Sequence, residues 1–131
     1  MIVVDASVLA NALVYADDRG RRARAVLALD TEWAAPEHWK VEVFSVMRGL
    51  ALGHKISEER ARGAIDLLPQ LGVDHVPIDP LLPRMWQLRS AVSGYDAAYV
   101  ALAEARDLTL VTSAGRLARA AAAVCATRLV E

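Results

Sequence analysis

The chain has 131 residues, of which 55% are hydrophobic, and a formal net charge of -1 at pH 7. This length suits one domain with a substantial core, yet no apolar run approaches the roughly 18 residues that a membrane span needs. The charge gives no global electrostatic argument for nucleic-acid binding, and the single cysteine, Cys125, excludes an intramolecular disulfide framework and a multi-cysteine zinc site. Since the N-terminus shows neither a basic segment nor a cleavage signature, we expect a cytoplasmic, non-membrane protein with a single domain over residues 1–131.

The chain opens with a short β-branched run, residues 2–4, which predicts a strand buried on both faces. Asp5 follows directly, and residues 6–13 then show a helical pattern. Asp5 is therefore expected at the carboxyl end of a buried strand, where open α/β sheets form their ligand-binding crevice. Two interpretations stay open: Asp5 caps the helix by accepting the Val8 amide, or it holds a metal ion.

The next stretch predicts a second strand over residues 33–35 and a helix over residues 37–52. The helix has an apolar stripe at spacings of three and four residues, made by Trp39, Val43, Val46, Met47 and Leu50. Glu42 lies at the border of this stripe. It is either an ordinary boundary residue with its carboxylate in water or part of a site.

The rest of the chain continues to alternate helices and strands. The expected helices cover residues 21–29, 57–71, 80–88, 96–104 and 116–122, and the expected strands cover residues 73–78, 108–112 and 125–130. In the helix over residues 21–29 we expect Leu29 to face inward, and in the helix over residues 80–88 we expect Leu82, Met85, Trp86 and Leu88 to be buried. This alternation predicts an α/β fold of three layers, in which helices cover both faces of a mostly parallel sheet of four to five strands.

Three carboxylates are expected to meet at one edge of this sheet. Asp5 ends the first strand, Asp96 opens the helix before the fourth strand, and Glu42 lies on the helix after the second strand. Each also has an ordinary explanation, which for Asp96 is a favourable charge in the first helical turn. Clustered carboxylates repel one another, so a divalent cation is the natural compensation, and all-oxygen ligands suit Mg²⁺ or Mn²⁺ better than zinc. The histidines, His38, His54 and His75, lack metal-site spacing and are expected at the surface.

Four stretches of the sequence carry a family resemblance. They are Ile2 to Ser7, Pro36 to Val43, Tyr95 to Ala103, and Leu110 to Ala118. In order and spacing they resemble the PIN-domain family, and most closely the VapC toxins of VapBC toxin–antitoxin pairs. The resemblance covers nearly the whole chain. It implies a PIN-like fold and a Mg²⁺-dependent endoribonuclease (Mn²⁺ being a substitute) that cuts cellular RNA and is silenced by a VapB-like antitoxin.

The resemblance also assigns roles to residues. Asp5, Glu42 and Asp96 match the family's acidic positions, and are expected to bind the metal and carry catalysis, while Ser7 matches a small hydroxyl position. The family usually has a fourth acid two residues after Thr112, where this chain has Ala114. Thr112 and Ser113 are supporting candidates that can hold a metal-bound water. The missing charge keeps an alternative open, a PIN-like module that binds RNA or its antitoxin without cutting.

Arginine is the second notable feature, because only Lys40 and Lys55 among the 15 basic residues are not arginine. Clusters occur at Arg19, Arg21, Arg22 and Arg24, at Arg60 and Arg62, and at Arg116 and Arg119. The guanidinium fork suits phosphate, so Arg116 and Arg119, near the fourth strand, are candidate RNA contacts; a solvated helix face is the alternative.

Two further expectations complete the sequence-based hypothesis. The high apolar content predicts an exposed apolar surface for a homodimer and for an antitoxin segment, and we expect these contacts on the helices around residues 39–50 and 82–88. A receiver-type phosphoacceptor domain fits poorly, because Asp5 has no acidic neighbour and no lysine follows Lys55.

Overall fold

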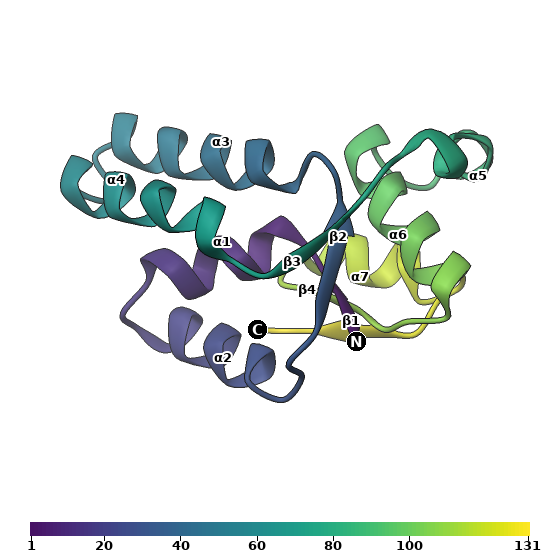
Figure 1. Ribbon diagram of the computed structural model, residues 1–131, viewed down its shortest axis with the longest axis horizontal. Coiled ribbons are helices and arrows are strands. Elements are labelled where there is room, and N and C mark those ends of the chain that lie inside the picture. The colour runs from purple at the N-terminus through teal and green to yellow at the C-terminus, as the bar shows by residue number, and fades with distance from the viewer.

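The computed structural model describes residues 1–131 and shows three layers (Figure 1). The middle layer is a sheet of five strands: β1 (Ile2–Val4), β2 (Trp33–Pro36), β3 (Val73–Val76), β4 (Leu110–Thr112) and β5 (Thr127–Leu129). Their order is β3-β2-β1-β4-β5, and every neighbouring pair is parallel. The predicted α/β class and layering are confirmed, and the sheet is parallel throughout.

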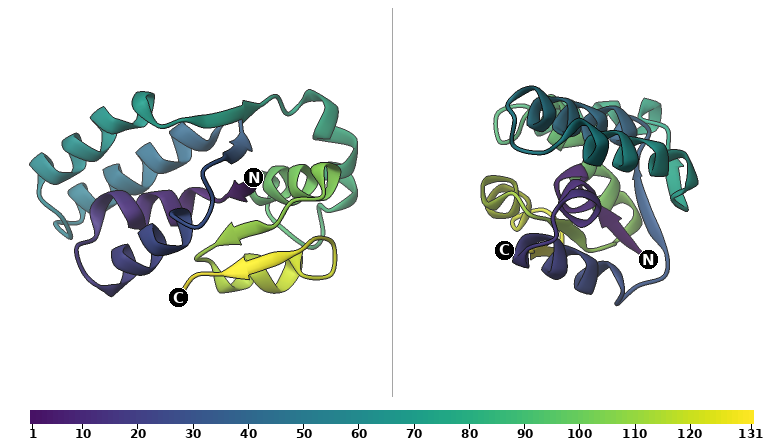
Figure 2. Two further views of the ribbon diagram at one scale, coloured as in Figure 1. Left: turned by 60° about the horizontal axis from the view of Figure 1, so that its bottom comes forward. Right: turned by 90° about the vertical axis from the view of Figure 1, so that its left-hand side faces the viewer.

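Helices cover both faces of the sheet. They are α1 (Ala6–Val14), α2 (Asp18–Leu27), α3 (Trp39–Leu52), α4 (Glu58–Leu67), α5 (Leu82–Gln87), α6 (Gly94–Arg106) and α7 (Gly115–Ala121), with short 3-10 turns at Leu68–Gln70 and Asp79–Leu81. Figure 1 shows α1 to α4 on one side of the sheet and α5 to α7 on the other. Figure 2 shows β5 at the edge of the sheet, beside β4 and α7. None of these helices is both long enough and apolar enough to cross a membrane.

Strand β1 forms the centre of the sheet because its side chains can be buried on both faces. Val3 and Val4 are fully buried between β2 and β4. Helix α6 packs on β1 and β2 through residues 97–103, all of which are buried. Four of these seven residues are alanines, and their small side chains let the helix lie close to the sheet. The carboxyl end of β1 is thus placed next to the first turn of α6.

Three sequence expectations about burial are wrong. Trp86 is 67% exposed and Leu82 is 47% exposed, because α5 has six residues and packs on the protein through Leu81 and Leu88 at its ends. Leu29, expected inside, is 71% exposed, since α2 ends at Leu27. Helix α2 also begins at Asp18, three residues before the expected start, because Asp17 caps it by accepting the amide of Arg19.

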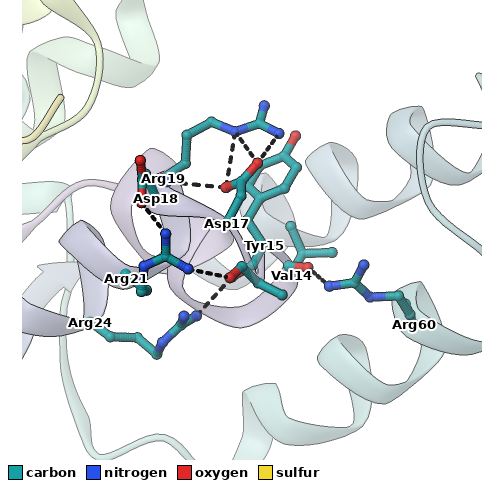
Figure 3. A network of polar contacts seen from close by, with 9 residues as sticks. Val14, Tyr15, Asp17, Asp18, Arg19, Arg21, Arg24 and Arg60 are labelled. Carbon is teal, nitrogen blue, oxygen red and sulfur yellow. Dashed lines mark hydrogen bonds and ion pairs between the residues drawn. The ribbon is translucent and has the colours of Figure 1, made fainter.

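Arginines close the C-terminal end of α1, where helical carbonyl groups lack partners (Figure 3). Arg24 Nη1 donates to the carbonyl oxygens of Ala12 and Tyr15, at 2.9 Å each, and Arg60 of α4 donates to that of Val14. The guanidinium of Arg19 lies 3.6 Å from the centre of the Tyr15 ring. Arg19, Arg24 and Arg60 therefore have structural partners within the chain, and their presence needs no phosphate ligand to explain it.

Candidate functional site

Asp5 stands where β1 ends and α1 begins. Its backbone amide donates to Val111 O at 2.9 Å, which continues the β1–β4 ladder and sets Asp5 beside Thr112. The residue has extended backbone angles at the N-cap of α1, yet its side chain makes no capping hydrogen bond. The buried carboxylate instead accepts two hydroxyl groups, from Ser7 Oγ at 2.6 Å and Thr112 Oγ1 at 2.8 Å. The capping interpretation of Asp5 is therefore wrong.

The two hydroxyl groups belong to a network that fixes the orientation of this carboxylate. Both donate to Oδ2, which leaves Oδ1 available to a ligand. The amide of Ser113 donates to Ser7 Oγ at 3.0 Å, and the amide of Ala114 donates to Thr112 Oγ1 at 3.0 Å. Each hydroxyl group accepts a hydrogen bond from a backbone amide that follows β4. The loop between β4 and α7 therefore fixes the orientation of the Asp5 carboxylate.

Glu42 lies in the first turn of α3, with its carboxylate half-buried at 24% exposure. The hydroxyl group of Tyr99, a fully buried residue of α6, donates to Oε1 at 2.7 Å. Burial raises the pKa of Glu42 from its usual value near 4.5 to about 7, and the charges of Asp5 and Asp96 add to the shift. Burial likewise raises the pKa of Tyr99, so this hydroxyl stays a donor. A boundary residue with its carboxylate in water would have neither a buried hydrogen-bond donor nor a raised pKa. The interpretation of Glu42 as an ordinary boundary residue is therefore wrong.

Asp96 is the third residue of α6 and does not cap it. Ser93 is the N-cap, and its Oγ accepts the amide of Asp96 at 3.2 Å. The Asp96 carboxylate is therefore not needed to cap the helix, although its place in the first turn still gives it a favourable interaction with the helix dipole. Burial raises the pKa of Asp96, and the negative charge of Asp5 raises it further. Asp5, Glu42 and Asp96 thus repel one another.

The three carboxylates line one cavity of about 460 Å³. The other lining residues are Ala6, Ser7, Val41, Ser45, Val46 and Tyr95. Its donors are all oxygen atoms, which suits Mg²⁺ or Mn²⁺, and a divalent cation would relieve the repulsion that raises the pKa values of Glu42 and Asp96. The chain has no group of three acidic, histidine or cysteine side chains gathered as ready-made metal ligands. The oxygen donors of the pocket fit Mg²⁺ or Mn²⁺ in kind, but the three carboxylates are not gathered closely enough to form a preassembled metal site.

A family model described as "PIN domain" matches residues 2–123 of this chain. The chain belongs to the PIN-domain family. Similar proteins include Ribonuclease VapC1 of Mycobacterium tuberculosis, 41% identical over 134 residues, with 98% of this chain and 97% of that protein covered. Ribonuclease VapC9 of the same organism is 37% identical over 125 residues, with 95% and 94% covered. The predicted resemblance to VapC proteins is confirmed.

Solved structures show the same fold at lower sequence identity. The crystal structure of Mycobacterium tuberculosis VapC20, described as a Sarcin-Ricin loop cleaving toxin, has a TM-score of 0.65 at 17% identity and covers 84% of this chain and 87% of its own. FitAcB from Neisseria gonorrhoeae has a TM-score of 0.68 at 20% identity, with 97% and 96% covered. Both support the PIN fold of this chain.

Some residues predicted for this PIN-domain site lie outside the pocket. The Ser113 hydroxyl is buried without a partner, and only the Ser113 amide reaches the network around Asp5. Ala114 occupies the N-cap of α7 and supplies no side-chain cap. Arg116 and Arg119 are exposed on α7 and do not line the cavity. Nothing in their contacts favours an RNA role over a solvated helix face.

Sequence reasoning missed the aromatic residues beside the acids. His38, expected at the surface, is half-buried, with its ring centre 5.7 Å from that of Tyr95 and 5.6 Å from that of Tyr99. Its Nε2 lies 3.1 Å from Glu42 Oε1, although the two are not aligned for a hydrogen bond. Burial lowers the pKa of His38, which keeps the imidazole neutral near pH 7. The spacing of four residues between His38 and Glu42 indicates that these two side chains can meet, but it does not predict the aromatic rings of α6 that bury His38.

Proposed function

We propose that this chain is a metal-dependent endoribonuclease that acts in the cytoplasm as the toxin of a type II toxin–antitoxin pair. The observation that carries this proposal is the convergence of Asp5, Glu42 and Asp96, from three separate elements, on one open pocket. The ribonuclease names of relatives that match nearly the whole chain support it.

We assign two roles to the three carboxylates. Bound Mg²⁺ supplies a positive charge that neutralises the scissile phosphate and acidifies water. Asp5, fixed through Oδ2, would hold the cation with Oδ1, and Asp96 would be its second carboxylate ligand. Glu42 has Oε1 engaged by Tyr99, so Oε2 can orient the attacking water and accept its proton. In-line attack would leave 5′-phosphate and 3′-hydroxyl ends.

The partners are inferred from exposed apolar side chains on the two helices predicted for these contacts. Helix α3 exposes Phe44 and Leu52, and α5 exposes Leu82 and Trp86. Apolar groups in such number at a surface favour burial against protein. We assign these helices to a homodimer and to a VapB-like antitoxin segment.

A second candidate function is a PIN-like module that binds RNA or its antitoxin without cleaving RNA. The observation that favours it is Ala114, which leaves the loop after β4 without the fourth carboxylate. Because one negative charge fewer weakens the attraction for a divalent cation, the site holds metal less tightly than a four-acid site would.

The deciding experiment measures RNA cleavage by the purified chain with Mg²⁺, Mn²⁺ or EDTA. The variants are Asp96→Asn, Ala114→Asp and, as a matched control, Asp66→Asn on the exposed face of α4. Metal-dependent cleavage that Asp96→Asn abolishes and Asp66→Asn retains would establish the nuclease. If only Ala114→Asp cleaves RNA, the native chain is the PIN-like module that binds without cleaving. If neither the native chain nor any variant cleaves RNA while RNA or antitoxin is still bound, the nuclease proposal is refuted.

A further inference from the structure

Tyr95 is exposed in the first turn of α6, a helix whose middle is buried. Its side chain is 68% exposed, whereas residues 97–103 of α6 lie in the core. It immediately precedes Asp96 and lines the same pocket as Asp5 and Glu42. A large aromatic side chain is thus presented to solvent at the rim of the acidic pocket.

The ring of Tyr95 is supported from one side. The His38 ring packs against it at 5.7 Å between centres with planes inclined by 51°, and His38 in turn meets the buried Tyr99 ring nearly edge-on, at 74°. Because three rings pack in sequence, the orientation of Tyr95 is restricted before any ligand arrives. Helix α3 contributes two exposed aliphatic side chains to the same pocket, Val41 and Val46, at 67% and 38% exposure.

The charge of the pocket restricts what these apolar surfaces can bind. None of the nine residues that line it is lysine or arginine, and three are carboxylates, so the protein itself offers a phosphate only repulsion there. Flat apolar faces suit a nucleobase, which has a π-surface whatever its identity. A base within a duplex is already stacked on its neighbours, whereas an unpaired base is free to stack on an aromatic side chain.

We propose that Tyr95, with Val41 and Val46 beside it, forms a subsite that stacks an unpaired nucleobase next to the phosphodiester to be cut. This inference rests on the proposed function, since it places the base relative to the three carboxylates. It makes Tyr95 a residue that determines specificity by structure rather than by base identity.

The test measures binding in EDTA, so that it does not depend on cleavage. The probe is a single-stranded RNA of about ten nucleotides with a fluorescent 2-aminopurine, compared with the same strand in a duplex and with a strand that lacks one base. The variants are Tyr95→Ala, Tyr95→Phe and, as a control, Leu29→Ala, which removes a similarly exposed apolar side chain outside the pocket. Each variant is first shown to melt like the native protein.

Loss of stacking should weaken binding of the single strand by about 5- to 150-fold in Tyr95→Ala. Tyr95→Phe should keep native binding, Leu29→Ala should have no effect, and duplex RNA should not distinguish the proteins. Equal binding of the single strand by native protein and Tyr95→Ala overturns the subsite, as does an equal loss for the RNA without a base.

Cleavage assays separate this inference from the proposed function. If the native chain and Tyr95→Ala cut RNA with the same KM, the proposed nuclease function is supported and the stacking subsite is refuted. Tyr95-dependent binding by a chain that cuts no RNA with Mg²⁺ or Mn²⁺ supports the subsite and refutes the nuclease.

Discussion

Replacing Glu42 by Gln should stabilise the metal-free protein at neutral and alkaline pH. Glutamine keeps an oxygen that accepts the Tyr99 hydroxyl and removes the charge that faces Asp5 and Asp96. In the native chain the folded-state pKa of Glu42 is raised to about 7 from 4.5, so the folded state binds this proton more tightly than the unfolded state. Native stability therefore falls as pH rises through this window and stays low above it.

The structure sets the size of this effect. A shift of about 2.5 pKa units corresponds to a ceiling of about 3.4 kcal/mol at 1.36 kcal/mol per unit. Since solvent reaches part of the carboxylate and screens its charge, we expect about 1–3 kcal/mol. For a domain of this size, that raises Tm by roughly 4–12 °C.

Thermal unfolding in EDTA, at about pH 5 and about pH 8, measures this difference. The Tm of Glu42→Gln should exceed the native Tm at the higher pH and approach it at the lower one. Added Mg²⁺ should narrow the gap, because the cation stabilises the native carboxylates. The control, Glu104→Gln, removes an exposed carboxylate whose pKa is lowered by its hydrogen bond to Arg84, so it should not be stabilising. A Glu42→Gln gap that is absent or negative at high pH would refute the cost of holding a charged Glu42, which comes first from burial and then from the charges of Asp5 and Asp96.

Three further substitutions test the contacts around the site. Tyr99→Phe should lower kcat about tenfold or more with little change in KM, because Glu42 loses a hydrogen bond of about 1.5–3 kcal/mol; an unchanged kcat would contradict this. Thr112→Val should weaken Mg²⁺ binding in calorimetry, because Asp5 loses one of its two donors; native affinity would contradict it. Arg60→Ala should cost about 1 kcal/mol in denaturant unfolding while cleavage by the folded protein persists, and a loss of cleavage would be contrary evidence.

Much of the fold follows from residue patterns that are local in the chain. The β-branched residues 2–4 and the apolar run ending at Thr112 each predict a buried strand, and parallel strands bring their carboxyl ends to one edge. That argument alone places Asp5 near Thr112. The pattern gives the neighbourhood of Asp5, whereas the choice of Oδ2 as the bound oxygen depends on hydroxyl rotamers that no periodicity encodes.

Other features depend on contacts between distant parts of the chain. His38 is half-buried because rings from α6 pack over it, and residue spacing within α3 contains no information about them. Helix α5 has fewer than two turns, so its apolar residues do not define one inward face, and Trp86 is exposed. Sequence patterns are least informative where an element is short or where its neighbours come from far along the chain.

The parallel sheet also determines when the site can form during synthesis. β1 pairs with β2 and β4, and the hydrogen bond from Thr112 to Asp5 spans 107 residues of sequence. Domains fold as their residues leave the ribosome, N-terminal segments first, so Asp5 and Glu42 emerge long before Asp96 and the hydroxyl group of Thr112. A nascent chain of this protein therefore has an incomplete site until almost all of it has been translated.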